Sequence, residues 1–181
     1  MKILILTILL LPFYSFAQKD TIISFSEVVL LDSMTQNQLF QNARHWYNNT
    51  FKSSKEVLQI VDKETGELSG KGLLRSYYDF NSIQFGKSYV CYYRFNIEIK
   101  VRENKYRYEF TNFIIDEVLT PAIGVFPVMT SSSECPKRYP GYGKAKTDGM
   151  YLSMKTQLES EMNVLINSLK QEMAKRPTDD F

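Results

Sequence analysis

The sequence is poor in the residues from which most catalytic and metal sites are built. It has a single histidine, His45, and two cysteines, Cys91 and Cys135, which stand far apart. Zinc sites need clusters of histidine and cysteine ligands, and the chain has no HExxH or CxxC motif. A Ser-His-Asp triad would have to use His45, and no serine has the glycine pattern of a nucleophile elbow. We therefore expect no metal and no cofactor, and we favour a function other than catalysis.

An excess of charge of one sign is also lacking. The chain has 22 lysines and arginines against 20 aspartates and glutamates, a net charge of +2, and no long block of like charge. Nucleic-acid binding needs a surface that neutralises phosphates, so we expect neither nucleic acid nor an anionic membrane as a partner. The hydrophobic content of 44% excludes a mainly disordered chain.

The sequence has one long apolar run, at its N-terminus, and this run is too short to span a bilayer. Lys2 precedes the apolar residues 3–11, and Ser15-Phe16-Ala17 has the small-x-small pattern of a cleavage site. We therefore predict a signal peptide over residues 1–17, cleaved after Ala17, and an exported protein that is periplasmic or secreted. No transmembrane segment is expected in the mature chain. The alternative is an uncleaved N-terminal anchor.

Export would place the two cysteines in an oxidising compartment, where disulfides persist. A bond between Cys91 and Cys135 would close a loop of about forty residues and stabilise the fold by about 4 kcal/mol in the chain-entropy model. The alternative is two unpaired thiols, with Cys91 buried on a strand. Pairing depends on the separation of the two Cα atoms, so the sequence leaves both alternatives open.

Apolar periodicity predicts five strands and two helices in one α+β domain. Strands are expected over residues 21–31, 56–62 and 68–77, and as a long hairpin within residues 89–115 that turns at Glu103-Asn104. Helices are expected over residues 35–51, after a cap at Ser33 or Thr35, and over residues 150–175. The order is β-α-β-β-β-β-α, a single antiparallel sheet with both helices on one face. We divide the chain into the signal peptide 1–17, a core of sheet and first helix 18–117, a proline-rich irregular connector 118–149, the second helix of the same domain 150–175, and a tail 176–181.

The two faces of the central hairpin differ in chemistry. Alternate residues from Cys91 to Val101 are apolar or aromatic and are expected to face the core. The opposite face carries charged and aromatic residues of mixed sign, which are typical of a solvated, salt-bridged sheet. We also take that face as the candidate binding face, with the residues Tyr92, Arg94, Lys100, Arg107 and Phe113.

Three stretches of the sequence carry a resemblance to a known family. They are FSEVV from Phe25, the segment LFQNARHWYNNTFKSSKEVLQIVDKETGELSGKG over residues 39–72, and YYRFNIEIKVRENKYRYEFTNF over residues 92–113. These stretches resemble a family of exported bacterial proteins known as a domain of unknown function with a TBP-like fold. The resemblance implies one curved antiparallel sheet with both helices on its convex side, and it implies no catalytic residue. Where family members usually have Lys-Asp-Gly in the central turn, this chain has Arg102-Glu103-Asn104.

The function that we favour from these observations is a non-enzymatic binding or interaction module of the bacterial cell envelope. Its partner would be an envelope protein, a peptide or a glycan held on the candidate binding face. One alternative is a hydrolase that uses carboxylates beneath the proline-rich connector. Another is a structural or assembly role through exposed edge strands or through the methionine-rich second helix.

Overall fold

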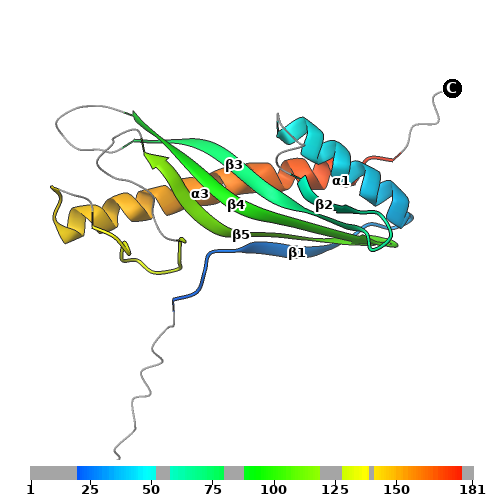
Figure 1. Ribbon diagram of the computed structural model, residues 1–181, viewed down its shortest axis with the longest axis horizontal. Helices are drawn as coiled ribbons and strands as arrows, with labels where there is room; N and C mark the ends of the chain where they lie inside the picture. The colour runs from blue at the N-terminus through cyan, green and yellow to red at the C-terminus, as the bar shows by residue number, and fades with distance from the viewer. Residues whose placement is uncertain (1–19, 52–57, 80–87, 119–127, 139–140, 177–181) are drawn as a thin grey trace, which may run out of the picture.

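Five antiparallel strands form one open sheet in the computed structural model, which describes residues 20–51, 58–79, 88–118, 128–138 and 141–176 (Figure 1). The elements, in chain order, are β1 (Phe25–Leu30), α1 (Gln36–Thr50), β2 (Leu58–Asp62), β3 (Glu67–Asp79), β4 (Ser88–Arg102), β5 (Lys105–Val118) and α3 (Lys144–Met173). The predicted order β-α-β-β-β-β-α is confirmed. The predicted signal peptide, residues 1–17, lies outside the described residues. Within the described ranges, no helix has the length and apolarity needed to cross a membrane.

The long hairpin of β4 and β5 lies at the centre of the sheet, whose strand order is β1-β5-β4-β3-β2. Its turn holds Asn104 at a φ of 60°, a left-handed conformation that asparagine tolerates better than most residues. The Asn104 amide donates a hydrogen bond of 2.9 Å to the carbonyl of Met34, and its side-chain oxygen accepts one of 3.1 Å from the Met34 amide. These two bonds fix the hairpin turn beside the start of α1.

Both helices cover the same face of the sheet (Figure 1). Helix α1 begins at the predicted cap: the Thr35 hydroxyl accepts from the Gln38 amide, and the Gln38 side chain accepts from the Thr35 amide. This capping box satisfies two backbone donors that the first helical turn leaves free. Buried residues of α1 and α3 then meet the aromatic inner face of the sheet in a single core.

Helix α3 is longer than the sequence predicted. It begins at Lys144 rather than at residue 150, so the irregular connector is shorter than 118–149. The first turns are held by an ion pair of 3.0 Å between Lys144 and Asp148, and by burial of Thr147 and Met150. Gly149 and the nearby glycines and prolines obscured the helical pattern in the sequence, because these residues are poor helix formers.

A bulge in β5 changes which side chains face the core. Asn96 of β4 pairs with Thr111, whereas Arg94 pairs with Ile114, so β5 holds one residue more than β4 in this interval. The extra residue inverts the alternation beyond it. Phe113 is therefore fully buried, and its ring stacks on Phe95 with centroids 5.2 Å apart. The prediction that Phe113 lies on the solvent-facing side is wrong, because it extended the alternation of the hairpin through this bulge.

Candidate binding face

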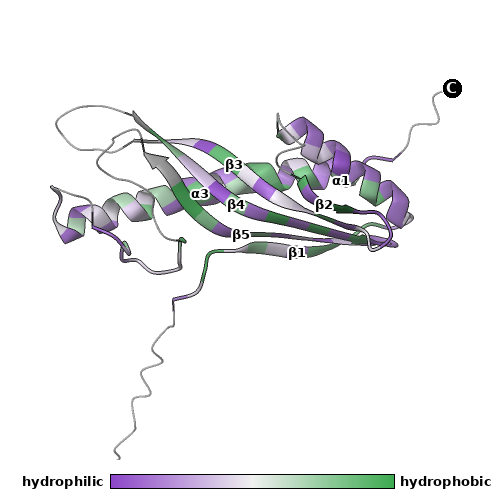
Figure 2. Cartoon of the chain, in the orientation of Figure 1, coloured by the Kyte–Doolittle hydropathy of each residue, from purple (hydrophilic) through white to green (hydrophobic). Residues whose placement is uncertain are grey.

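The sheet has a second face, turned away from both helices, which we call the outer face. Alternation along the strands places on it the side chains that do not enter the core, and Figure 2 shows hydrophilic and hydrophobic residues alternating along the central strands. From β1, β3, β4 and β5 they include Ser26, Val28, Leu30, Ser69, Lys71, Leu73, Arg75, Tyr77, Tyr92, Arg94, Asn96, Glu98, Lys100, Arg102, Lys105, Arg107, Glu109 and Thr111.

Four of the five predicted binding residues lie on the outer face, but the structure does not bring them together. Lys100 and Arg107 face each other across β4 and β5 near the hairpin turn. Tyr92 and Arg94 lie in the first half of β4, and Lys100 is eight positions further along the strand than Tyr92, about 26 Å away. The outer face therefore has two separate ends, and an occupant that touched both would have to be extended.

The charges near the hairpin turn are partly compensated. Lys100 Nζ lies 3.1 Å from Glu98 and 3.7 Å from Glu67, and Arg107 is bound to Glu109. The hydrogen bond to Glu98 raises the pKa of Lys100, and the hydrogen bond to Glu109 raises the pKa of Arg107. All of these groups are exposed enough for water to screen them, so their contribution to stability is small. This is the salt-bridged sheet surface that the sequence predicted.

The other end of the outer face exposes apolar and aromatic surface that the sequence analysis missed. Leu73 lies opposite Arg94, and Arg75 lies opposite Tyr92. The Arg75 guanidinium stands 5.1 Å from the centre of the Tyr77 ring, a cation–π distance. Leu73 and Tyr77 are each 53% exposed. The sequence did carry a signal for this surface: Leu73, Arg75 and Tyr77 are spaced two residues apart in the predicted strand 68–77, so their side chains must share a face.

Two hollows lie among the described residues of the outer face. A polar hollow of about 340 Å³ lies over the middle of the sheet, among Ser69, Lys71, Asn96, Glu98 and Thr111. A second hollow of about 240 Å³, which we call the basic depression, lies near the hairpin turn. It is lined by Val28, Lys100, Arg102, Lys105, Tyr106 and Arg107.

The two cysteines are free thiols, so the structure does not contain the disulfide that the sequence left open. Cys91 is fully buried on the core face of β4, and burial raises the pKa of its thiol. Cys135 is half-buried, and its thiol donates a hydrogen bond of 2.9 Å to the Lys137 carbonyl. Burial also raises the pKa of Cys135. Reactive thiols need a lowered pKa, so neither group is set up as a nucleophile.

The carboxylates next to the described part of the connector are engaged in ion pairs. Glu134 and Asp148 lie 3.1 Å and 3.0 Å from Lys144 Nζ. A hydrogen bond from the Cys135 amide and the ion pair with Lys144 lower the pKa of Asp148, so this group stays ionised at neutral pH. Among the described residues, no three histidine, cysteine, aspartate or glutamate side chains gather as metal ligands.

The sheet and the first helix are the part of the chain that matches a known family. Residues 25–115, half of the chain, match the model of a domain of unknown function (DUF4468) with TBP-like fold. The chain belongs to this family. The resemblance drawn from the sequence is therefore confirmed, as is the TBP-like fold.

Two solved structures resemble this DUF4468 chain in fold. One is a DUF4468 family protein from Bacteroides ovatus ATCC 8483, with a TM-score of 0.61 and 13% identity over 87% of this chain and 89% of that chain. The other is a TBP-like protein from Parabacteroides distasonis ATCC 8503, with a TM-score of 0.49 and 9% identity over 81% of this chain and 92% of that chain. No curated protein matches the sequence. At 13% identity the likeness to the first of these structures shows the fold alone, and function has to be argued from the site.

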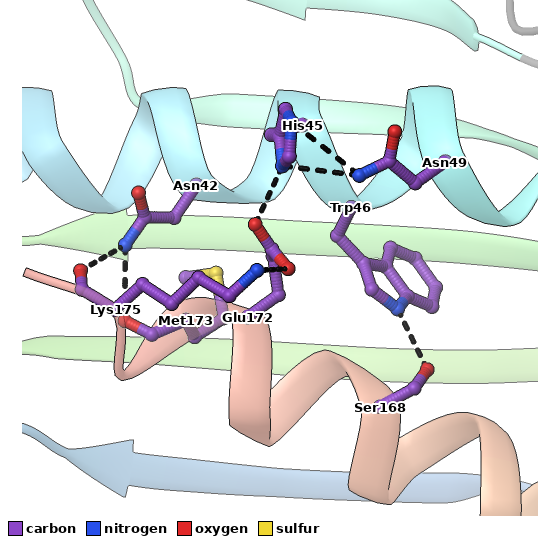
Figure 3. A network of polar contacts seen from close by, with 8 residues as sticks. All are labelled: Asn42, His45, Trp46, Asn49, Ser168, Glu172, Met173 and Lys175. Atoms are coloured by element: carbon purple, nitrogen blue, oxygen red, sulfur yellow. Dashed lines mark hydrogen bonds and ion pairs between the residues drawn. The ribbon is translucent and has the colours of Figure 1, made fainter.

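Helix α3 lies beyond the segment that matches the family model, and a polar network fastens it to α1 (Figure 3). His45 Nδ1 lies 2.5 Å from a carboxylate oxygen of Glu172, whose other oxygen pairs with Lys175 at 2.6 Å. Burial alone would raise the pKa of Glu172, but the hydrogen bonds from Lys175 and His45 outweigh it and lower that pKa. The Trp46 indole donates a hydrogen bond of 2.9 Å to the Ser168 hydroxyl. The single histidine is therefore used to join two helices.

Proposed function

We propose that this protein is an exported binding module of the bacterial cell envelope and that it holds an extended ligand on the outer face of its sheet. The ligand would be a peptide, a glycan or a segment of an envelope protein. The observation that carries the proposal is the exposure of Leu73 and Tyr77, each 53%, on a face that neither α1 nor α3 covers.

The chemistry of this end of the outer face supports recognition. A solvated face of an antiparallel sheet is normally polar, so large exposed apolar and aromatic side chains at neighbouring positions depart from that pattern. Tyrosine and arginine are enriched among residues that dominate binding energy, because each offers a wide contact surface with a polar tip. Tyr77, Arg75 and Tyr92 combine both types on adjacent strands.

The described part of the connector is bound to β5 and to α3. Met129 is buried, and its amide donates a hydrogen bond of 2.8 Å to the Phe113 carbonyl. Thr130 and Tyr151 hydrogen-bond to each other, which ties residues 128–138 to the start of α3. These contacts hold that segment against β5 at Phe113 and against the start of α3.

The export part of the proposal is supported by residues 1–17, which combine Lys2, an apolar run and a small-x-small site. Fractionation of cells expressing the full chain tests it. We expect the protein in the periplasmic fraction or the culture medium, with an N-terminal sequence that begins at Gln18. Recovery from the cytosol with Met1 still present would contradict it.

A pull-down from a cell-envelope extract tests the binding part. We expect the wild-type mature protein to retain a partner and the variant Tyr92→Ala/Arg107→Ala to lose it. The matched control, Glu159→Ala/Val164→Ala, changes two exposed residues of α3, on the opposite side of the molecule. It should retain the partner. Equal recovery with all three proteins would show that the outer face is not the binding surface.

A further inference from the structure

We propose that the free edge of β1, together with the basic depression beside it, docks an extended acidic segment of a partner protein, which joins the sheet as an additional strand. This inference rests on the proposed function, since both place a ligand on the outer face. It names the class of ligand and the manner of its binding at the hairpin end. It is carried by the backbone of β1, by two rows of side chains and by the chemistry of the basic depression.

The edge of β1 is open for strand addition. The register of β1 with β5 is regular over its six residues, and the one charged residue of its sequence FSEVVL, Glu27, is already bound by Tyr108 and Lys170. The Leu31 amide donates a hydrogen bond to the Asn104 carbonyl in the turn of the central hairpin. In an antiparallel pair every second residue bonds to the neighbouring strand, so Ser26, Val28 and Leu30 direct their backbone groups away from β5. Edge strands are usually protected by charge, proline or bulges, because unpaired backbone groups recruit other strands.

The opposite edge of the sheet is protected in the usual manner. β2 has five residues, and a bulge between Leu58 and Ile60 breaks its register with β3. A bulge twists an edge away from the geometry that a new strand needs. The two edges therefore differ, and β1 is the one suited to pairing with another chain.

Two rows of side chains cross the outer face beside this edge. Val28, Arg107 and Lys100 form one row, and Leu30, Lys105 and Arg102 form the next. Each row sets two cations directly opposite each other, an arrangement that is unfavourable unless an anion lies near. The exposed apolar side chains stand at the β1 end of each row, where Val28 is 58% and Leu30 is 72% exposed.

The two rows differ in how their charge is compensated. Lys100 and Arg107 have Glu98, Glu67 and Glu109 as partners. Among the described residues, Arg102 and Lys105 form no ion pair and no side-chain hydrogen bond. The neighbouring Glu103 is already used, since its carboxylate accepts a hydrogen bond of 3.0 Å from the Gln36 amide at the start of α1. The row of Arg102 and Lys105 is therefore the part of the basic depression that lacks an anion.

An acidic strand complements this arrangement. Neighbouring strands lie about 4.8 Å apart, so an outward side chain of an added strand would lie next to Val28 or Leu30 and about 10 Å from the β5 backbone. That distance is within the combined reach of a glutamate and a lysine or arginine. Apolar groups on the same strand would cover Val28 and Leu30, while main-chain hydrogen bonds would supply affinity, as in other cases of strand addition.

A second copy of this chain fits less well. If it paired through its own β1, it would present Ser26, Val28 and Leu30 on the outer face and no carboxylate. Its Glu27 lies on the inner side of the sheet, where the carboxylate accepts a hydrogen bond of 2.8 Å from Tyr108 and one of 2.6 Å from Lys170. Arg102 and Lys105 would remain without an anion in such a dimer.

Fluorescence anisotropy with labelled synthetic peptides and the mature protein tests the proposal. The probe is a short peptide in which glutamate and valine alternate. One control peptide has lysine in place of glutamate, and another keeps the glutamates but has N-methylated backbone amides. We expect the acidic peptide to bind. Both control peptides should bind at least about tenfold more weakly, since one loses the charge and the other loses the strand hydrogen bonds.

Protein variants locate the site. Arg102→Glu/Lys105→Glu should weaken the acidic peptide by about tenfold or more, because two attractions become repulsions. The control Arg44→Glu/Lys63→Glu makes the same change of net charge at exposed positions of α1 and of the β2–β3 turn, and should leave binding unchanged. Val28→Pro removes a donor that points away from β5, so the protein should fold, as thermal unfolding would show, and lose the peptide.

Three outcomes would overturn the proposal. They are no binding of the acidic peptide to the wild-type protein, equal binding of the N-methylated peptide, and a concentration-dependent dimer that Val28→Pro abolishes, which would mean that a second copy occupies the edge. A different result is that the acidic peptide shows no binding, while the wild-type protein retains a partner from the envelope extract and Tyr92→Ala does not. In that case this inference fails and the proposed function stands. If neither binds, both fail.

Discussion

Two tyrosine hydroxyl groups in the core differ in whether they have a hydrogen-bond partner. The Tyr93 hydroxyl donates a hydrogen bond of 2.9 Å to the Met154 carbonyl of α3. The Tyr106 hydroxyl is buried and has no partner within the described part of the chain. Burial raises the pKa of Tyr106, and the nearby charge of Glu27 adds to this, so the group stays neutral. A buried polar group without a partner costs more than the same site filled by an apolar group.

We therefore expect opposite results from the same substitution at the two positions. Tyr106→Phe should leave the free energy of unfolding unchanged or raise it by about 1 kcal/mol, since it removes a group that gains nothing from folding. Tyr93→Phe should lower it by about 1 kcal/mol, since it removes the hydrogen bond from this hydroxyl to the Met154 carbonyl. Urea unfolding of both variants measures the difference. A larger loss for Tyr106→Phe than for Tyr93→Phe would show that the Tyr106 hydroxyl has a partner.

Some single residues could be assigned from the sequence because their role is local. Thr35 and Gln38 have the spacing of a capping box, and the bonds form as predicted. Tyr106 could not be recognised as unpartnered, because that depends on packing between β5, β1 and α3. Nor could the state of Cys91 and Cys135 be predicted, since pairing requires a separation that only the fold sets.

Strand β5 shows how one residue alters the chemistry of a whole element. The apolar alternation of the hairpin was predicted correctly up to Phe110 and failed from Phe113, where the bulge inverts the faces. A bulge adds one residue without a turn motif, so the sequence around Thr111 and Asn112 carries no strong signal. The sequence could thus place β5 and its pairing with β4, but not the face of its second half. Phe113 was lost from the candidate site for that reason.

The conformation of Asn112 gives the bulge a testable signature. Its φ is 57°, a region that glycine and asparagine tolerate and that β-branched residues avoid. Asn112→Val should lower the free energy of unfolding by about 1–3 kcal/mol, whereas Asn112→Gly should change it by less than about 1 kcal/mol. Chemical denaturation measures both. Equal losses would mean that the side chain of Asn112, rather than its backbone, matters at this position.

The contact between α1 and α3 should depend on pH. Hydrogen bonds from Lys175 and His45 outweigh burial and lower the pKa of Glu172 below its ordinary value of 4.5. A carboxylate with a lowered folded-state pKa contributes stability above its unfolded pKa, and the contribution is lost as the pH falls through the folded-state pKa. Glu172 should therefore stabilise the α1–α3 contact at neutral pH and cease to do so well below pH 4.5.

Glu172→Gln tests this linkage. At neutral pH the variant should be less stable than the wild type, and the two stabilities should converge as the pH falls below 4.5, the ordinary pKa of the group. Glu159→Gln is the matched control, because Glu159 lies exposed on the same helix. It should leave the pH dependence of the wild type intact. Parallel curves for Glu172→Gln and the wild type would rule out the proposed contribution of Glu172.

The whole molecule consists of two layers, and the layer of helices is needed to cover the sheet. The sequence could predict the order of elements and the fold class, because strand alternation and helical periodicity are strong over long segments. It could not predict how the outer face divides into two ends, since Tyr92 and Lys100 are distant along one strand and Val28, Leu73 and Tyr77 come from others. The candidate site is a property of the sheet register rather than of a motif.

The family match ends at residue 115, yet the sheet and first helix should not fold without α3. Nine apolar or aromatic residues of α3 are buried: Met150, Tyr151, Met154, Leu158, Met162, Leu165, Ile166, Leu169 and Met173. Burial of each large apolar side chain is worth about 1.5–3 kcal/mol, so the nine together contribute about 14–27 kcal/mol, which is as large as or larger than the net stability of about 5–15 kcal/mol that a domain has. The aromatic inner face of the sheet, which includes Tyr93 and Phe95, would lie exposed without them.

A fragment of residues 18–143 should therefore show no cooperative thermal unfolding and should bind a hydrophobic dye, in contrast to a chain of residues 18–181. Addition of a synthetic peptide of residues 144–176 should restore a cooperative transition, because α3 packs on the sheet through side chains that a separate chain also presents. The variant peptide Met154→Asp/Leu158→Asp, with two charges on the buried face, serves as the control and should not restore it. A fragment that unfolds cooperatively by itself would show that α1 alone can cover the inner face.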